Sequence, residues 1–358
     1  MRVSLIGPPQ SGKSTMFAAI AQAGGSRVDL SRPDQPHIAV VKVPDERLEW
    51  LSAFYHPKKH TPAELEFLDL PGLDLSDEAG RTRAKAHWAA MRQSDMLAFV
   101  VRAFESAAVA PYRDRVSPAA DVEELLAEMI FADLDQVTVR VGKLEAAIRK
   151  PAPVAQREEQ ARELDLMKRL AAALEKGEPL LEAVHGEAQF KQFRGFAFLS
   201  RKPMLAVLNR SEEEAGAPAP EKLGGLPCLG LSAKIEEEIA RLAPEERAEF
   251  LSDLGISAPA RDRLIRACYQ RTGLVSFFTV GEDECRAWTV PAGTDAVTAA
   301  GEIHTDLARG FIRAEVVSYA DLRAGGDMKA AKAAGKVRLE GKSYVVRDGD
   351  VMLIRFAV

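Results

Sequence analysis

The sequence predicts an α/β fold with a mostly parallel, doubly wound sheet, a long helical insertion and a smaller α+β domain at the C-terminal end. Three observations lead to this prediction. Apolar strand-like runs alternate with helical segments, one stretch between two of these runs has heptad-like spacing, and short β-rich runs gather after about residue 274. The chain has 358 residues, which at about 150 residues per domain suits two to three domains.

Composition narrows the class of protein. Hydrophobic residues make up 47% and charged residues 28%, and the formal net charge is −5, so nucleic-acid contact requires a local basic patch. The three cysteines, Cys228, Cys268 and Cys285, form no CxxC or Cys/His cluster. This pattern argues against a disulfide framework or a zinc site and favours the cytoplasm. Every apolar run is far shorter than the roughly 20 residues of a membrane span, so no membrane partner is expected.

The first predicted elements are a strand at residues 3–6, a loop and a helix with apolar spacing from Met16. The loop, Gly7 to Ser14, matches G-x-x-x-x-G-K-[ST] in full. In that pattern backbone N–H groups surround an anion, the lysine charge reaches the β- and γ-phosphates, and the serine hydroxyl reaches Mg²⁺. A structural turn is the alternative, but the strand–loop–helix context favours a phosphate-binding loop, in which Lys13 also stabilises transition-state charge. The predicted nucleotide-binding residues of this loop are Gln10, Ser11, Gly12, Lys13, Ser14 and Thr15.

Further apolar runs continue the predicted sheet, at residues 38–43, 64–70, 96–101 and 204–208. The run at 64–70 ends in Asp69-Leu70-Pro71-Gly72. A carboxylate at such a strand end is expected to hold Mg²⁺ together with Ser14, and the alternative is that Asp69 caps the next turn. Gly72 lets the backbone approach the γ-phosphate and is therefore a predicted nucleotide-binding residue. Leu73 follows it where many GTPases carry the glutamine that orients the attacking water.

The far end of the predicted nucleotide site begins where the run at 204–208 leads into Asn209-Arg210-Ser211-Glu212. GTPases carry Asn-Lys-x-Asp here, and its aspartate takes two hydrogen bonds from guanine. Glu212 is longer and the preceding lysine is missing, which weakens the case for guanine. A second short motif, Ser232-Ala233-Lys234, follows another apolar stretch and can supply a backbone donor to the base. The candidate base-binding residues are Asn209, Glu212, Ser232, Ala233 and Lys234.

The helical insertion is predicted at residues 121–195. Its first run has apolar residues alternately four and three apart, namely Ile130, Leu134, Val137, Val141, Leu144 and Ile148. Pro151 and Pro153 interrupt this run, and the second run carries Leu164, Met167, Leu170 and Leu174. Two such helices joined by a proline turn predict an antiparallel coiled-coil arm. A plain amphipathic hairpin packed on the sheet is the alternative.

The C-terminal domain is predicted at residues 274–358, which leaves 1–120 and 196–273 for the nucleotide-binding domain. Its β-rich runs lie at 276–280, 286–290, 311–317, 343–347 and 351–356, with a helical piece at 296–307. A basic cluster contains Lys329, Lys332, Lys336, Arg338, Lys342 and Arg347. Such a cluster can contact RNA phosphates without reading sequence, so no DNA sequence specificity is expected; the alternative is an ordinary solvated face.

The chain resembles the YchF/Obg-like ATPase family, a branch of the translation-factor class of P-loop NTPases, over essentially its whole length. The motifs that carry the resemblance are the phosphate-binding loop, VPDERL at 43–48, DLPGL at 69–73, Asn-x-x-Glu, RAWT at 286–289, GEIHTD at 301–306, GFIRAE at 310–315, LEGK at 339–342 and DGDV at 348–351. The resemblance implies a helical arm inserted in the G domain, a C-terminal ubiquitin-like β-grasp (TGS) domain, ATP binding at least as good as GTP binding, and association with ribosomes. The hydrophobic Leu73 is a mark of this family.

Three departures from the family pattern concern hydrolysis. The expected first-switch threonine falls at Pro33 or a neighbour, residues 74–85 contain only Gly80 of a glycine-rich second switch, and a loop histidine expected near Pro111 is missing. Phosphoryl transfer depends on positioning and electrostatics, so these losses predict slow turnover with phosphate binding intact. We therefore expect a Mg²⁺-dependent ATPase or GTPase, ATP favoured, that switches on the ribosome or RNA. The alternative is a hydrolysis-deficient, nucleotide-sensing RNA- or protein-binding scaffold.

Overall fold

The computed structural model divides the chain into two compact units. The first unit contains Met1–Ala39 and Glu66–Arg261, and the second contains Val40–Leu65 and Asp262–Val358. The residues that the structure describes are 1–23, 31–32, 34–183, 194–253, 256 and 258–357. The segment Val40–Leu65 thus packs with the C-terminal residues, although the chain before and after it belongs to the first unit. The division predicted from sequence, with boundaries near residues 120, 196 and 274, stays a prediction.

The phosphate-loop sheet has seven strands in the order β2-β4-β1-β5-β6-β8-β7. Their bounds are β1 (Arg2–Ile6), β2 (His37–Lys42), β4 (Glu64–Asp69), β5 (Met96–Ala103), β6 (Met204–Arg210), β7 (Lys222–Leu223) and β8 (Leu226–Leu231). β1 runs parallel to β4 and β5, β5 to β6, and β6 to β8, whereas β7 is antiparallel to β8. β5 and β6 are buried along nearly their whole lengths, which explains their continuous apolar sequences. The predicted parallel sheet is confirmed.

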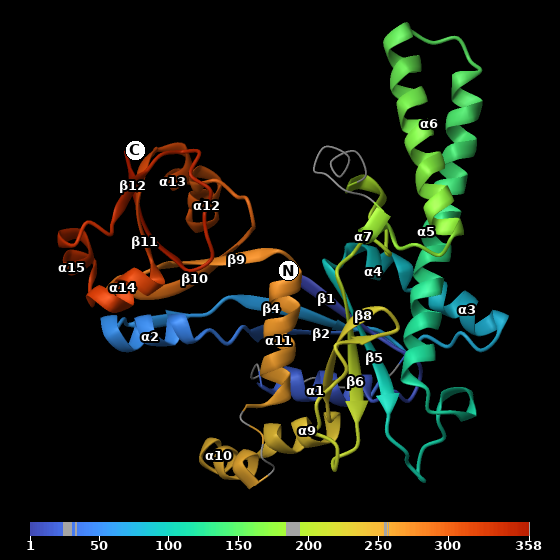
Figure 1. Cartoon of the computed structure of the whole chain (residues 1–358), viewed down its shortest axis with the longest axis horizontal. Helices are drawn as coiled ribbons and strands as arrows, with labels where there is room; N and C mark the ends of the chain where they lie inside the picture. Colours follow the sequence, from blue (N-terminus) through green and yellow to red (C-terminus); the bar gives the residue numbers. More distant parts are fainter. Residues whose placement is uncertain (24–30, 33, 184–193, 254–255, 257, 358) are drawn as a thin grey trace. The chain divides into compact units, whose positions relative to one another are not determined.

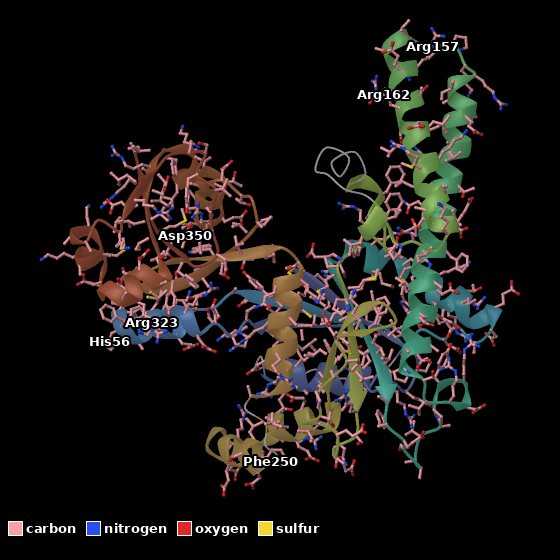
Figure 2. The ribbon with its side chains drawn as sticks, in the orientation of Figure 1. His56, Arg157, Arg162, Phe250, Arg323 and Asp350 are labelled. Carbon is pink, nitrogen blue, oxygen red and sulfur yellow. The ribbon has the colours of Figure 1, made fainter. Side chains whose placement is uncertain are left out.

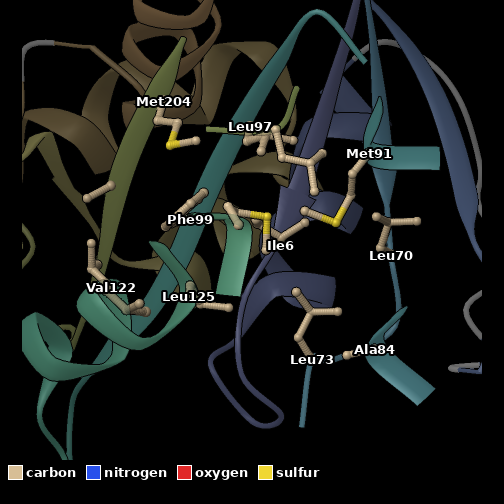
Figure 3. Packing of buried hydrophobic residues seen from close by; sticks show 14 of the residues in the cluster. Ile6, Leu70, Leu73, Ala84, Met91, Leu97, Phe99, Val122, Leu125 and Met204 are labelled. Atoms are coloured by element: carbon tan, nitrogen blue, oxygen red, sulfur yellow. The ribbon is translucent and has the colours of Figure 1, made fainter. Parts of the chain in front are cut away.

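Helices of the first unit cover this sheet, and the two longest extend away from it (Figure 1). The helices of this unit are α1 (Lys13–Ala23), α3 (Glu78–Lys85), α4 (Trp88–Gln93), α5 (Pro118–Ile148), α6 (Val154–Glu175), α7 (Leu180–Ala183), α9 (Ala233–Arg241) and α10 (Pro244–Asp253), with short 3₁₀ turns at Tyr112–Asp114 and Arg194–Phe196. A further helix, α11 (Ala260–Arg271), lies mostly in the second unit. Between sheet and helices, Ile6, Leu97 and Phe99 meet Met91 of α4 and Leu125 of α5 in one buried cluster (Figure 3). Apolar residues of separate strands and helices thereby form the core that fixes the loops at the strand ends.

The predicted helical arm is confirmed as the pair α5 and α6, which lie side by side in Figure 1. The apolar residues buried between them include Ile130, Val137, Leu144, Met167, Leu170 and Leu174. Charged pairs flank this seam: Arg140 contacts Glu163 and Lys168 contacts Glu145, each at 2.7 Å. The first turns of α5 also pack on β5. The same helix therefore belongs to the sheet's core at one end and to the arm along the rest.

The second unit contains a six-stranded sheet in the order β12-β11-β13-β9-β10-β3. Its elements are α2 (Glu46–Tyr55), β3 (Lys59–Thr61), β9 (Leu274–Thr279), β10 (Glu284–Pro291), α12 (Ala296–Ile303), α13 (Thr305–Arg309), β11 (Phe311–Ser318), α14 (Tyr319–Gly325), α15 (Met328–Ala333), β12 (Arg338–Glu340) and β13 (Asp350–Phe356). Buried residues such as Phe277, Ala300 and Met352 form its core. The predicted α+β domain is confirmed, but β3, from far earlier in the chain, adds a strand parallel to β10.

One prediction for this unit, a strand, is wrong, and another, a helical piece, is confirmed except for a break. Residues 343–347 form no strand; Val345 makes only an isolated bridge with Asp295. Instead the Tyr344 hydroxyl donates to Asp350 at 2.7 Å, and the amide of Val346 donates to the distant carbonyl of Thr294 at 2.9 Å, so the segment pairs through one bridge rather than a strand ladder. The helix expected at 296–307 breaks at His304, whose extended backbone (φ −163°) separates α12 from α13 and whose ring caps α13.

Among the described residues, no helix has the length and apolar character needed to cross a bilayer.

Candidate functional site

The phosphate-binding loop lies between β1 and α1, as its motif predicts. Gln10 and Gly12 both have positive φ, 62° and 83°, a conformation that turns successive backbone N–H groups toward one side and makes an anion-binding concavity. Gly12 is required for a second reason: a Cβ built there lies 2.1 Å from Nδ2 of Asn209. The loop's backbone thus supplies the donors that a phosphate needs.

Lys13 and Ser14 both contact Asp69 at the end of β4. The Lys13 ammonium donates to the carboxylate of Asp69 and to the carbonyl of Leu70, and the Ser14 hydroxyl donates to the other carboxylate oxygen at 3.1 Å. Lys13 is 5% exposed and Asp69 is 3% exposed, so this ion pair is largely removed from water. The structure therefore brings together the predicted lysine, serine and carboxylate, with the lysine held on the carboxylate.

The segment after Asp69 runs along the entry of the phosphate loop. The Leu73 amide donates to the carbonyl of Gly7 at 2.9 Å, and a Cβ built on Gly72 lies 3.0 Å from Cα of Pro9. The Leu73 side chain is fully buried and points into the core beneath the sheet (Figure 3). It cannot orient water from that position, because only its backbone faces the loop.

At the other end of the loop, Asn209 joins two predicted segments. Its Nδ2 donates to the carbonyl of Ser11 and its Oδ1 accepts from the amide of Ala233, both at 2.9 Å. Asn209 is 3% exposed, so both bonds are shielded from water. The predicted base-site residue therefore holds the phosphate loop against the 232–234 loop.

A cavity of about 490 Å³ opens beside this junction, within the usual range for ligand pockets. The predicted residues lining it are Gly12, Thr15, Asn209, Glu212, Ser232, Ala233 and Lys234. Glu212 and Lys234 form an ion pair at its rim, and the hydrogen bond that Lys234 donates to Glu212 raises the pKa of Lys234 above its ordinary value. The candidate base-binding residues thus surround one hollow.

The lining residues that sequence reasoning missed include Phe104, Glu105 and Ser106. These residues directly follow β5. Ligands of such sheets bind at the carboxyl ends of the parallel strands, so the end of the apolar run at 96–101 could have indicated them. The guanidinium of Arg102 lies over the Phe104 ring, 4.6 Å from its centroid. His87, at the start of α4, was also given no role; burial and then the charge of Lys13 lower its pKa, which keeps the imidazole neutral at pH 7.

Two of the three departures expected to slow hydrolysis can be located relative to the described residues. Pro33, where the first-switch threonine is expected, lies outside the described residues. The segment expected to hold a loop histidine contains a 3₁₀ turn at Tyr112–Asp114, whose side chains contact the residues after Gly72. No group of three or more His, Cys, Asp or Glu residues able to hold a metal is found in the part of the chain that the structure describes.

Comparisons with known proteins agree with this arrangement. Residues 2–133 match the model MMR_HSR1, "50S ribosome-binding GTPase", and residues 274–357 match YchF-GTPase_C, "Protein of unknown function (DUF933)". The chain is 38% identical to the Ribosome-binding ATPase YchF of Bacillus subtilis over 369 residues, covering 100% of each. It is 32% identical to Obg-like ATPase 1 of Oryza sativa over 376 residues, covering 100% of this chain and 92% of that one.

Solved structures give the same result. The YchF GTPase of Schizosaccharomyces pombe superposes with a TM-score of 0.87 at 28% identity, covering 99% of this chain and 97% of that one. A GTP binding protein from Pyrococcus horikoshii, 17% identical with a TM-score of 0.60, bears on the fold alone. A phosphate loop between β1 and α1, an inserted two-helix arm and full-length identity above 30% lead to one conclusion: the chain belongs to the YchF/Obg-like ATPase family of P-loop NTPases.

Proposed function

We propose that this protein binds a nucleoside triphosphate with Mg²⁺ at the phosphate loop, prefers ATP to GTP, hydrolyses it slowly, and switches between nucleotide states on the ribosome. The observation that carries the proposal is the convergence of Lys13, Ser14 and Asp69 beneath a loop whose backbone forms an anion-binding concavity. Relatives named ribosome-binding ATPases support the ribosomal partner and do not favour the non-hydrolysing scaffold. With such a partner, the proposed location of the protein is the cytoplasm.

The site has the features that a nucleotide needs. Ser11 Oγ and Ser232 Oγ are buried without a hydrogen-bond partner among the described residues, and buried hydroxyls of this kind are normally satisfied. In the proposed complex the amides from Gln10 to Thr15 hold the phosphates, and Gly72 lets the backbone reach the γ-phosphate. The 490 Å³ cavity, with Phe104 among its lining residues, takes the base.

The donor set at Asp69 suits Mg²⁺. A carboxylate and a hydroxyl, Asp69 and Ser14, lie 3.1 Å apart, and Mg²⁺ is commonly held by one or two protein oxygens together with phosphates and water. When bound, the ion neutralises charge that develops on the phosphates. Lys13 is shared between Asp69 and Leu70, so we expect its ammonium to move from the carboxylate to the β- and γ-phosphates when nucleotide binds.

Slow hydrolysis follows from what this chain places near the γ-phosphate. Leu73 is buried in the core and supplies no polar group to a water molecule. The loop at residues 103–117 contains no histidine. Lys13 remains to stabilise the transition-state charge, so we expect turnover below about 0.01 per second without a partner, the rate of a switch whose catalytic arginine is in place.

Two basic surfaces are candidates for contact with ribosomal RNA, and neither implies DNA sequence specificity. In the C-terminal cluster, Lys332 lies 3.7 Å from Glu315 and Lys336 lies 3.1 Å from Asp321, which reduces the local positive charge. On the arm, Arg149 and Lys150 follow the last residue of α5, and Arg157 lies in the first turns of α6; all three are exposed. Figure 2 shows Arg157 near the end of the helix pair. Phosphate contacts through these side chains are strongly salt-dependent.

The test is a paired titration of the purified protein with non-hydrolysable ATP and GTP analogues in Mg²⁺, with ATP hydrolysis and ribosome co-sedimentation measured on the same preparation. We expect tighter ATP binding, slow turnover, and co-sedimentation that depends on the nucleotide. Lys13→Ala is expected to lose at least about tenfold in affinity. Lys176→Ala, an exposed lysine that follows α6 and belongs to neither basic surface, is the matched lysine control. Equal nucleotide affinity for Lys13→Ala and the unmodified protein contradicts the proposal.

A further inference from the structure

A strained turn lies beside the segment that follows Gly72. Arg113 (φ 53°, ψ 34°) and Asp114 (φ 52°) both adopt the left-handed region, although neither is glycine. Such residues cost conformational energy and persist only where their surroundings hold them, and they concentrate at functional and switch regions. The contacts that hold this turn therefore indicate what the strain is used for.

Both backbone groups of one residue are held by this turn. The amide of Leu75 donates to the hydroxyl of Tyr112 at 3.0 Å, and the guanidinium of Arg113 donates to the carbonyl of Leu75 at 2.9 Å. The guanidinium also lies over the Tyr112 ring, 5.5 Å from its centroid. Leu75 itself is 1% exposed. Because Leu75 lies close after Gly72, Tyr112 and Arg113 fix the backbone next to the expected γ-phosphate contact.

The same two side chains reach the first turns of α5. Arg113 forms an ion pair with Glu124, and the Tyr112 hydroxyl lies 3.5 Å from the other carboxylate oxygen of Glu124. A second pair, Arg81 of α3 with Glu128 of α5 at 3.4 Å, ties the helix that follows the Gly72 segment to the same surface. α5 continues from here into the arm. A contiguous set of polar contacts thus joins the Gly72 segment to the base of the arm.

We infer that Tyr112 and Arg113 form a latch, the Tyr112–Arg113 latch, which positions residues 72–76 against α5 and transmits the nucleotide state from Gly72 to the arm. The two residues are positioning residues, since they act through the Leu75 backbone and Glu124. A triphosphate that draws the Gly72 backbone toward its γ-phosphate shifts Leu75, and the latch carries this shift to Glu124. A two-state element biased by the ligand is what such coupling requires. The inference rests on the proposed nucleotide binding at Lys13.

The experiment is hydrogen–deuterium exchange on the full chain in Mg²⁺, comparing ADP with a non-hydrolysable ATP analogue. In the unmodified protein we expect exchange to differ between the two nucleotides both at residues 74–77 and at residues 118–130. In Tyr112→Phe, which removes a single hydroxyl, and in Arg113→Ala, the difference at 118–130 falls by at least about half, while analogue affinity changes less than about threefold. Arg115→Ala is the matched control, because Arg115 pairs with Asp121 of α5 at 3.1 Å and forms no hydrogen bond with Leu75 among the described residues.

The outcomes separate the two proposals. Failure of the unmodified protein to bind either nucleotide overturns the proposed function and the latch together. Normal nucleotide binding overturns the latch alone in either of two cases: the ADP-to-analogue difference at 118–130 is absent from the unmodified protein, or it survives intact in both latch variants. An equal loss of more than about tenfold for both nucleotides in Tyr112→Phe and Arg113→Ala makes the turn structural only, and likewise overturns the coupling.

Discussion

Replacing Asn209 by alanine separates two roles for this side chain, base recognition and loop junction. The side chain is 3% exposed, and its amide bonds the carbonyl of Ser11 and the amide of Ala233, both at 2.9 Å. Ser11 and Ala233 are each 2% exposed. Truncation therefore leaves one buried carbonyl and one buried N–H without partners, in a space about the size of one amide group.

The magnitude follows from those two groups. An unpaired buried donor or acceptor costs about 1–3 kcal/mol, and water that enters the new space recovers part of this. We expect the free energy of unfolding of Asn209→Ala to fall by about 2–4 kcal/mol. Since the junction orders both loops around the nucleotide, ATP and GTP analogues should lose affinity together, by about tenfold or about 1.4 kcal/mol.

The assays are urea unfolding followed by circular dichroism and nucleotide titration of the folded variant. Glu212→Gln is the matched control, because Glu212 lies at the cavity rim in an ion pair with Lys234 and does not make the bond to Ser11 that Asn209 makes. It should change the ratio of ATP to GTP affinity with little loss of stability. The junction reasoning is refuted if Asn209→Ala changes that ratio by more than about tenfold while stability falls by less than about 0.5 kcal/mol.

Three further predictions concern buried groups outside the cavity. Burial raises the pKa of Asp133 above its ordinary 3.8, against opposing hydrogen bonds from Leu199 and Ser200, so the folded chain keeps this proton longer than the unfolded chain. The free energy of unfolding of the unmodified protein, relative to that of Asp133→Asn, should therefore fall as pH rises from 3.8 through the folded pKa and stay constant above it. Urea unfolding at a series of pH values measures this difference, and a difference that does not change with pH contradicts the prediction. Leu170→Ala, which empties part of the seam between α5 and α6, should cost about 2–5 kcal/mol by circular dichroism, against less than about 1 kcal/mol for the exposed-pair control Lys168→Ala. Burial raises the pKa of the Cys268 thiol to about 12, so iodoacetamide at pH 8 should modify it, by mass spectrometry, only after unfolding; equal labelling of folded protein contradicts this.

Elements encoded by contiguous residues could be predicted from the sequence. The phosphate loop is one uninterrupted motif between an apolar run and a helical pattern, and β5 and β6 are continuous apolar runs because both faces are covered. The arm followed from its spacing, since Val137 and Leu144 repeat on the face that meets α6. In each case the pattern and the contact it serves lie on the same element.

Features that depend on distant partners could not be predicted. β3 is a three-residue strand whose pairing with β10 depends on residues more than 200 positions later, and its own sequence has no strand pattern. The pattern of residues 343–347 predicts a strand, yet only Val345 pairs, in an isolated bridge with Asp295, about 50 residues earlier in the chain. In the candidate site, Phe104 belongs to no recognisable motif. The hydrogen bond between Tyr112 and Leu75 depends on a left-handed turn that the residue types at 112–114 do not predict.

Two structural connections lead from the phosphate site to other parts of the chain, one through β4 and one through the segment after Asp69. β4 runs without interruption from Glu64 to Asp69, so the strand that ends at the proposed Mg²⁺ carboxylate begins in the 40–65 segment. That segment is held in the second unit by Arg47, which bonds Asp45 and Asp348 and stacks 5.1 Å from the Phe278 ring centroid.

The second route starts a few residues after Asp69 and ends on α5 through Tyr112, Arg113 and Glu124. The two routes differ in what they can transmit. A strand within a sheet resists displacement, because moving it breaks its ladder with β1, whereas the Leu75 segment is held by side-chain hydrogen bonds that can exchange one at a time. We therefore expect nucleotide exchange to change the arm first and the second unit only through movement of β4 as a whole. In the hydrogen–deuterium exchange experiment above, an ADP-to-analogue difference at α2 without one at α5 would contradict this expectation.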